Sequence, residues 1–205
     1  NFEIGYKYSQ GDLYYELAVF TIDLEDELIP FELAAFPGRR FYANAGNSSR
    51  EGIEAAIARS FDNGLRIDAS YTWSDFSFDD FVDDNGNDFS GNQLPGLPKH
   101  YGYLGLSYRG DSGLSATVEA VYSGELVANN ANTAEVSSYT VANLRLSHEV
   151  ESGSWIIRPY FGINNVFDED YNSNIRINAF GARYFEPAPG RNFYAGVVVN
   201  FSRSR

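Results

Sequence analysis

The sequence of 205 residues contains no cysteine and no methionine, and it has only two histidines. Without cysteine, a disulfide framework, a zinc–thiolate site and thiol catalysis are excluded. Without methionine there is no initiator residue, and the chain opens at Asn1 inside an alternating pattern of apolar and polar residues. We therefore expect a fragment or a processed product, in which no signal peptide would be visible.

Long hydrophobic runs are also missing, since no apolar stretch approaches the roughly 20 residues that a membrane-spanning helix requires. A membrane-spanning strand needs only about 9–11 residues, half of them apolar, so the mean hydropathy of −0.33 is compatible with insertion as strands. Basic residues are few, and the net charge of −13 argues against nucleic acid as a partner. The acids crowd at 23–27, 79–88 and 168–170, which we interpret as solvated loops.

Aromatic residues are abundant, with 15 Tyr and 16 Phe, and they suit strands and membrane interfaces. Apolar and polar residues alternate with a period of two through most of the chain, most clearly from Leu65 to Ser74. Tight turns are predicted at 10–12, 62–64, 109–113 and 151–153, and long polar loops at about 27–40, 79–98, 125–136 and 168–188. The pattern predicts about nine antiparallel strands, although residue propensity leaves a helix over Glu51–Ser60 as an alternative.

The strict alternation of short turns and long loops is typical of a transmembrane β-barrel, whose strands face lipid on one side and a wet lumen on the other. Trp73 and Trp155 lie at opposite ends of their strands on the apolar face, as expected for two aromatic girdles. Pro159 lacks an N–H and is expected at an edge or bulge. A soluble β-sandwich also alternates and stays open as an alternative. Charges on the polar face are expected to pair across strands; they are Glu54, Arg66, Asp68, Glu119, Arg145 and Arg158.

Four motifs follow one another along the chain. They are Asn44–Gly46 with Gly52–Glu54, the proline-rich Leu94–His100, the segment Asn164–Tyr171, and Pro189–Tyr194 before a last strand that carries Phe201. In this order they resemble the C-terminal barrel region of the TonB-dependent outer-membrane receptors. Asn164–Tyr171 is similar to the family signature Asn-Leu-Phe-Asp-x-x-Tyr, with Val166 in place of leucine. These barrels usually end on the aromatic residue, whereas Ser202–Arg205 follow it here.

The resemblance implies an all-β fold, in which residues 1–205 form the C-terminal portion of a 22-stranded antiparallel transmembrane barrel with short periplasmic turns and long extracellular loops. The N-terminal plug, the region that contacts TonB and the first strands would lie outside this sequence. It further implies a monomer in the bacterial outer membrane, among lipid and lipopolysaccharide, that imports a scarce small molecule such as a ferric siderophore, cobalamin or a glycan. The polar-face charges could then hold the plug or line the path. A passive pore or adhesion barrel and an outer-membrane enzyme are the alternatives.

The motif residues are expected to be structural; they are Asn164, Asn165, Phe167, Asp168, Tyr171, Gly190, Arg191 and Phe201. Asparagine side chains can satisfy backbone groups where a strand ladder ends, and Arg191 can pair with loop acids or with lipopolysaccharide phosphate. The candidates for ligand contact are Arg176, Arg183 and Tyr184 in the last long loop, because loops above a rigid scaffold carry recognition.

No catalytic, metal or cofactor site is predicted. His100 and His148 have no second His or Cys nearby, and no Gly-x-Ser-x-Gly occurs. The run Asp83–Asp88 suggests calcium only superficially, because the sixth position is Asp88 instead of glycine and the twelfth is Leu94 instead of glutamate. The sequence therefore predicts transport and not catalysis.

Overall fold

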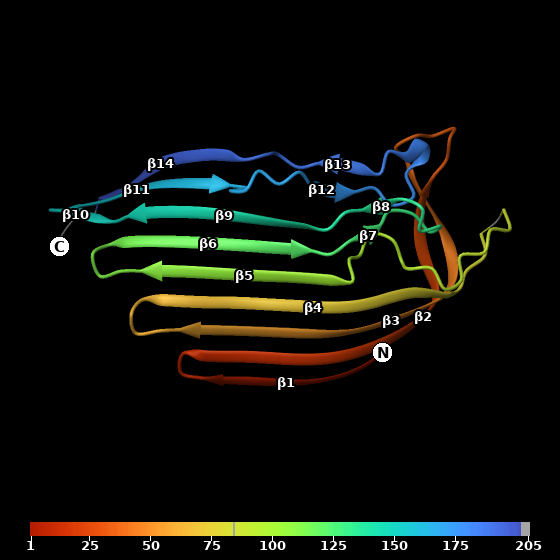
Figure 1. The fold of residues 1–205 in the computed structure, drawn as a ribbon, viewed down its shortest axis with the longest axis horizontal. Helices are drawn as coiled ribbons and strands as arrows, with labels where there is room; N and C mark the ends of the chain where they lie inside the picture. Colours follow the sequence, from red (N-terminus) through yellow and green to blue (C-terminus); the bar gives the residue numbers. More distant parts are fainter. Residues whose placement is uncertain (84, 202–205) are drawn as a thin grey trace.

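A single curved antiparallel sheet makes up most of the computed structural model, which describes residues 1–83 and 85–201 (Figure 1). Its strands are β1 (Phe2–Gln10), β2 (Leu13–Glu32), β3 (Arg40–Ser60), β4 (Leu65–Asp80), β5 (His100–Arg109), β6 (Leu114–Ser123), β9 (Tyr139–His148), β10 (Val150–Ser152), β11 (Trp155–Asn164) and β14 (Asn192–Phe201). Neighbours in sequence pair in the order β1-β2-β3-β4-β5-β6-β9-β11, and β10 and β14 both pair with β11. Asp84 and the Ser202–Arg205 tail lie outside the described residues.

The nine predicted strands are confirmed, with β9 and β10 together forming the strand expected after residue 139. The helix considered over Glu51–Ser60 is wrong, because this segment belongs to β3 and pairs with strands on both sides. The loops hold only short elements, which are β7 (Leu126–Val127), β8 (Glu135–Val136), β12 (Asn172–Ile175), the 3-10 turn η1 (Phe180–Ala182) and β13 (Phe185–Pro187). Among the described residues, no helix is long and apolar enough to cross a membrane.

The long loop predicted over 27–40 is wrong in its extent. β2 and β3 keep their antiparallel pairing as far as Glu32 and Arg40, so only 33–39 form the connection. The acids and Pro30 favoured a loop in the sequence, but Pro30 sits in the ladder opposite Tyr42. A β-hairpin therefore extends well beyond the rest of the sheet.

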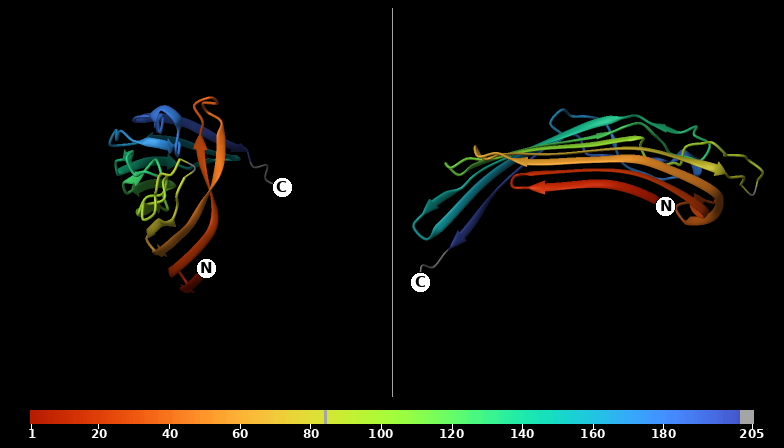
Figure 2. Two further views of the ribbon diagram at one scale, coloured as in Figure 1. Left: turned by 90° about the vertical axis from the view of Figure 1, so that its right-hand side faces the viewer. Right: turned by 90° about the horizontal axis from the view of Figure 1, so that it is seen from below.

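Contacts between side chains explain why strand β2 can accommodate acidic residues. Glu27 forms an ion pair with Arg50 and accepts a 2.5 Å hydrogen bond from Ser48, which is completely buried. The Arg50 guanidinium also lies over the Phe76 ring, 5.6 Å from its centroid. Beyond the main sheet, the hairpin turns across the end of the sheet toward β12 and β13 (Figures 1 and 2). Within it, Asp26 has a φ of 58°.

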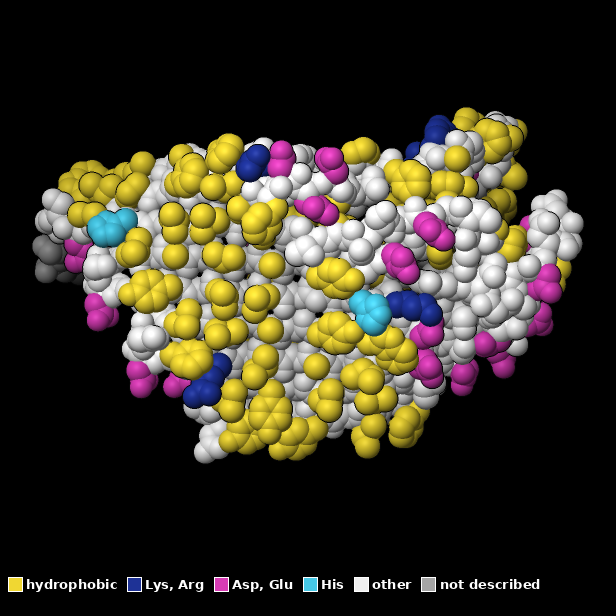
Figure 3. All heavy atoms as spheres, in the orientation of Figure 1, with side chains coloured by type: hydrophobic (Ala, Val, Ile, Leu, Met, Phe, Trp, Pro, Cys, Tyr) yellow, Lys and Arg dark blue, Asp and Glu magenta, His cyan; other side chains and the backbone are white. Residues whose placement is uncertain are grey.

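The sheet has one apolar and one polar face, as the alternation predicts. Hydrophobic side chains gather over the convex face (Figure 3), where Leu104, Val118 and Val197 are 43%, 40% and 59% exposed. In residues 1–83 and 85–201 no second layer packs on them. The sandwich alternative is therefore wrong, since a sandwich would bury these side chains between two sheets.

The charges of the concave face make mostly cross-strand contacts. Tyr103 donates to Glu119 at 3.1 Å, and Arg145 lies 5.0 Å from the centroid of the Tyr160 ring. Arg66 instead pairs within its own strand, with Asp68 at 2.5 Å. The expectation that these charges pair with one another across strands is therefore wrong in its partners. Among the described residues, the ion pair between two of the six charges lies within β4, and the cross-strand partners of Glu119 and Arg145 are tyrosines.

Two glycines of the concave face each lie under a tyrosine ring of the opposite strand. Tyr194 covers Gly162, its partner in the ladder, and Tyr160 covers Gly196 in the same way. A Cβ at either glycine would overlap the ring. The pairing fixes the register of β11 against β14, because a slip would place a side chain under each ring.

Pro159 sits at an interruption of the sheet. The ladder from β9 ends at Ser147 opposite Tyr160, and β10 resumes it at Val150 opposite Ile157. Pro159 therefore faces the gap between β9 and β10, where its missing N–H costs no hydrogen bond between strands. This agrees with the expectation that Pro159 lies at an edge or bulge.

Candidate functional site

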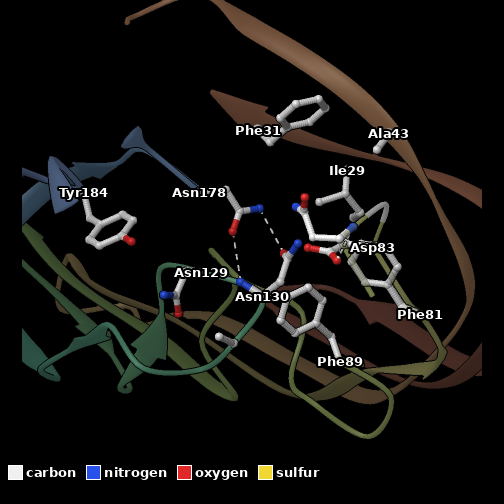
Figure 4. Close-up of a pocket in the computed structure, with 12 residues that line it drawn as sticks. Ile29, Phe31, Ala43, Phe81, Asp83, Phe89, Asn129, Asn130, Asn178 and Tyr184 are labelled. Atoms are coloured by element: carbon white, nitrogen blue, oxygen red, sulfur yellow. Dashed lines mark hydrogen bonds between the residues drawn. The ribbon is translucent and has the colours of Figure 1, made fainter. Parts of the chain in front are cut away.

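At the end of the sheet opposite the short turns, three long loops and the extended β2–β3 hairpin surround a hollow, here named the loop cavity (Figure 4). Its volume is about 310 Å³. The residues that line it are Ile29, Phe31, Ala43, Phe81, Asp83, Asn85, Phe89, Asn129, Asn130, Ala131, Asn178 and Tyr184. The loop cavity is thus bordered by segments far apart in the sequence, with aromatic rings and amides as its main surfaces.

An apolar cluster supports one wall of the loop cavity. Ile29, Phe78, Phe81 and Leu94 are buried, with exposed fractions of 7% or less. The Phe81 ring centroid lies 4.9 Å from that of Phe78 and 5.4 Å from that of Phe89. Burial of such side chains stabilises a fold by roughly 1.5–3 kcal/mol each, so this wall is preformed.

Asparagine side chains tie the connections to one another. Asn178 Nδ2 donates to the Pro30 carbonyl and to Asn130 Oδ1, both at 2.9 Å, and the Asn130 N–H donates to Asn178 Oδ1 at 2.9 Å. Asn132 Oδ1 accepts from the Gln93 N–H at 2.8 Å, while its Nδ2 donates to the Gln93 carbonyl at 2.9 Å. These bonds hold three loops and the β2–β3 hairpin in one arrangement around the loop cavity.

An ionic contact joins the same hairpin to the last loop. The Glu32 carboxylate is 2.5 Å from Arg176 and 3.4 Å from Arg183, and it accepts a 3.1 Å bond from the Gly38 N–H. Its side chain is only 3% exposed. The Gly38 N–H and the two arginine charges lower the pKa of Glu32. The carboxylate is therefore ionised at neutral pH.

The structure separates the three predicted ligand contacts. Arg176 and Arg183 converge on Glu32, and neither lines the loop cavity. Tyr184 does line it, and Figure 4 shows its hydroxyl directed inward. The backbone of the same residue accepts a 2.8 Å bond from the Arg176 N–H. Ligand recognition by Arg176 and Arg183 stays a prediction. The ring of Tyr184 lies on the wall of the loop cavity, where it could contact a bound molecule.

Asp83 is the one carboxylate lining the loop cavity in the described part of the chain. It accepts 2.9 Å bonds from the Asn85 N–H, the Asn87 N–H and the Asn87 amide, a turn closed by its own side chain. The Asn87 amide is the main cause of the lowered pKa of Asp83. Of the acids that suggested calcium in the sequence, Asp83 thus uses its oxygens within the loop itself, and Asp84 lies outside the described residues.

The Asn164–Tyr171 motif lies on the rim where β11 ends. Asn165 is 2% exposed, and its side chain accepts from the Glu169 N–H and donates to the Glu169 carbonyl, both at 2.8 Å. Its own N–H donates to Asn143 Oδ1 at 3.0 Å, and its φ is 52°. Asparagine suits this position because it tolerates the left-handed region and supplies both a donor and an acceptor.

The remaining motif residues connect the rim to the last strand. Asp168 Oδ1 accepts from the Arg191 N–H at 2.7 Å, and Gly190 lies beside the same carboxylate. The Arg191 guanidinium donates to the Val166 carbonyl at 3.2 Å. The Tyr171 ring lies 4.7 Å from that of Tyr139.

Aromatic residues mark both ends of this region. Phe167 is 73% exposed on the rim, while Phe201 packs on Trp155 at the turn end with 4.8 Å between ring centroids. Asn164 donates to Asn192 at 2.9 Å across β11 and β14. All these residues lie apart from the loop cavity, and a structural role for them stays a proposal supported by these contacts.

Sequence reasoning missed most of the loop cavity, including Phe31, Phe81, Asn130 and Asn178. Two signals in the sequence could have indicated them. One is the continued spacing of phenylalanines from Phe76 into the following loop, and the other is the density of asparagine at 129–132.

Comparison with known proteins identifies the class. A family model described as TonB dependent receptor-like, beta-barrel, matches residues 1–166. The chain belongs to the TonB-dependent receptor family, whose members are transport receptors of the outer membrane of Gram-negative bacteria. The short turns of the sheet therefore correspond to the periplasmic side, and the loop cavity to the extracellular side.

Individual relatives are receptors for iron chelates. A probable TonB-dependent siderophore receptor, PiuA of Acinetobacter baumannii, is 27% identical over 98% of this chain and 26% of its own length. The ferrioxamine receptor of Yersinia enterocolitica is 27% identical over 64% of this chain and 18% of its own length. The crystal structure of PiuA superposes with a TM-score of 0.75 at 25% identity, over 96% of this chain and 27% of that one. The chain spans about a quarter or less of the length of these curated relatives.

Proposed function

We propose that this chain is part of a receptor that imports a ferric siderophore across the outer membrane, with energy supplied through TonB. The observation that carries the proposal is the loop cavity, a preformed hollow with aromatic and amide walls at the extracellular end of the sheet. The relatives described above support the ligand class, since PiuA is a probable siderophore receptor and a further relative is a ferrioxamine receptor.

We further propose that residues 1–205 are the C-terminal portion of the barrel and that a plug and the TonB-contacting region belong to other parts of the polypeptide. The open sheet supports this, because among the described residues β1 and β14 each pair with one strand only. Two free edges are aggregation hazards that further strands of a closed barrel would remove. The apolar convex face supports contact with outer-membrane lipid and lipopolysaccharide, and no catalytic role is proposed.

The experiment measures uptake of radiolabelled ferric siderophores by Gram-negative cells that lack their own receptors and express the full-length polypeptide. We expect uptake that requires TonB, saturates, and falls at least tenfold in Phe81→Ala and Tyr184→Ala variants, because both remove cavity walls. The matched control is Phe180→Ala, an aromatic residue of the same loop that is 46% exposed and does not line the loop cavity. Uptake that persists without TonB and does not saturate would instead indicate a passive pore.

A further inference from the structure

We infer that the loop cavity takes an uncharged or cationic chelate that carries amide-type groups, such as a ferric hydroxamate. This inference rests on the proposed receptor function and goes beyond it, because it assigns the charge and the chemistry of the ligand.

The arginines of the neighbouring segments make their contacts outside the loop cavity. Arg176 and Arg183 are the cations closest in sequence to Tyr184, and both turn to the Glu32 carboxylate, which is 3% exposed. Arg39, at the tip of the β2–β3 hairpin, lies over the Phe41 ring at 5.3 Å. None of these side chains lines the loop cavity. A polyanionic chelate would therefore meet no direct cationic partner on the described walls.

The described walls of the loop cavity carry negative charge. Among the described lining residues Asp83 alone is charged, and its lowered pKa keeps it ionised. A negative group at a partly enclosed wall repels anions and attracts cations, and low dielectric surroundings strengthen both effects. The wall charge therefore favours a ligand of zero or positive charge.

The uncharged part of the walls consists of asparagine amides and apolar side chains. Asn178 and Asn129 use their amides to bond other loop residues. Among the described residues, the Asn130 Nδ2 group has no protein partner. Such an asparagine amide on the wall can donate and accept hydrogen bonds with a ligand. Amide and hydroxamate groups of a ligand do the same and match such walls without bringing charge. Between the amides stand aromatic rings such as those of Phe81 and Phe89, which provide apolar surface for hydrocarbon spacers. The combination fits a chelate of alternating amide-type groups and short alkyl chains.

The experiment measures the affinity of the purified full-length polypeptide for three iron complexes. Ferrichrome is an uncharged hydroxamate, ferrioxamine B is a cationic hydroxamate, and ferric citrate is anionic. We expect either hydroxamate to bind at least tenfold more tightly than ferric citrate. If ferric citrate binds most tightly and is imported through TonB, the charge assignment is overturned while the receptor function stands. If no ferric complex is imported, both proposals fall.

A charge introduced into the wall tests the same point independently. Ala131→Lys places a cation at an exposed lining position, and Ser138→Lys adds the same charge outside the lining as the matched control. We expect Ala131→Lys to weaken ferrioxamine B binding at least about threefold and to strengthen ferric citrate binding. We expect Ser138→Lys to change neither affinity. Equal effects of the two variants would overturn the inference, because they would reflect long-range attraction and not the wall.

Discussion

An arginine placed on the convex face at Leu104 should destabilise the barrel strongly. Leu104 is the fifth of ten residues in β5, is 43% exposed, and lies between Ala69 and Ala120 of the flanking strands. Ten residues with a rise of about 3.4 Å and a tilt of about 45° span roughly 22 Å of membrane, which places Leu104 within about 2 Å of the midplane. There, an arginine on the lipid face costs about 2–4 kcal/mol.

The assay is reversible unfolding of the full-length barrel in lipid bilayers by guanidinium chloride. A loss of 2–4 kcal/mol reduces the folded-to-unfolded ratio roughly 30- to 700-fold. The matched control is Ser70→Arg, which lies on the concave face of the neighbouring strand beside Tyr103 and should cost under about 1 kcal/mol. Equal losses for the two variants would refute the assignment of the faces, and so would a silent Leu104→Arg.

The other predictions concern single contacts. Gly162→Ala should cost about 1–3 kcal/mol in the same unfolding assay by displacing a tyrosine ring, whereas Gly102→Ala should be nearly neutral because its nearest neighbour would lie 3.8 Å away; similar losses would contradict this. Asn165→Ala should cost about 1–3 kcal/mol by leaving buried backbone groups unpaired, and full stability would show that water replaces the amide. Because the pKa of Glu32 is lowered, its ion pairs should protect the hairpin from protease above about pH 4.3 and lose this effect as the pH falls through the lowered value. Glu32→Gln should remove that pH dependence, and an unchanged profile would assign it to another group.

Strands were predictable from the sequence because their signal is local. The alternation from Leu65 to Ser74 and the Asp62–Gly64 turn define β4 and its connection to the preceding segment without knowledge of any distant residue. The extent of the β2–β3 hairpin was not predictable in this way. Its acidic residues favour a loop by composition, and only the contacts of Glu27 with Arg50 and Ser48 explain how they fit in a strand.

The loop cavity could not be derived from the sequence, because its walls meet only in the folded chain. Asn178 bonds to Pro30 across 148 positions, and Gln93 bonds to Asn132 across 39. Arg176 and Arg183 were selected as loop cations, but a partner 144 or more positions away decides where they point. Loop position alone thus indicates which segments lie near a ligand, and distant contacts decide which side chains reach it.

The hydrogen bonds that asparagine side chains make between the loops determine the conditions under which the loop cavity keeps its shape. Side-chain amides do not titrate, and bonds between them are not weakened by dissolved ions in the way that exposed ion pairs are. The Asn130–Asn178 and Gln93–Asn132 contacts should therefore persist from fresh water to brine and from acid to alkaline surroundings. The hairpin, held partly by Glu32, should loosen first when conditions become harsh, while the other loops stay joined.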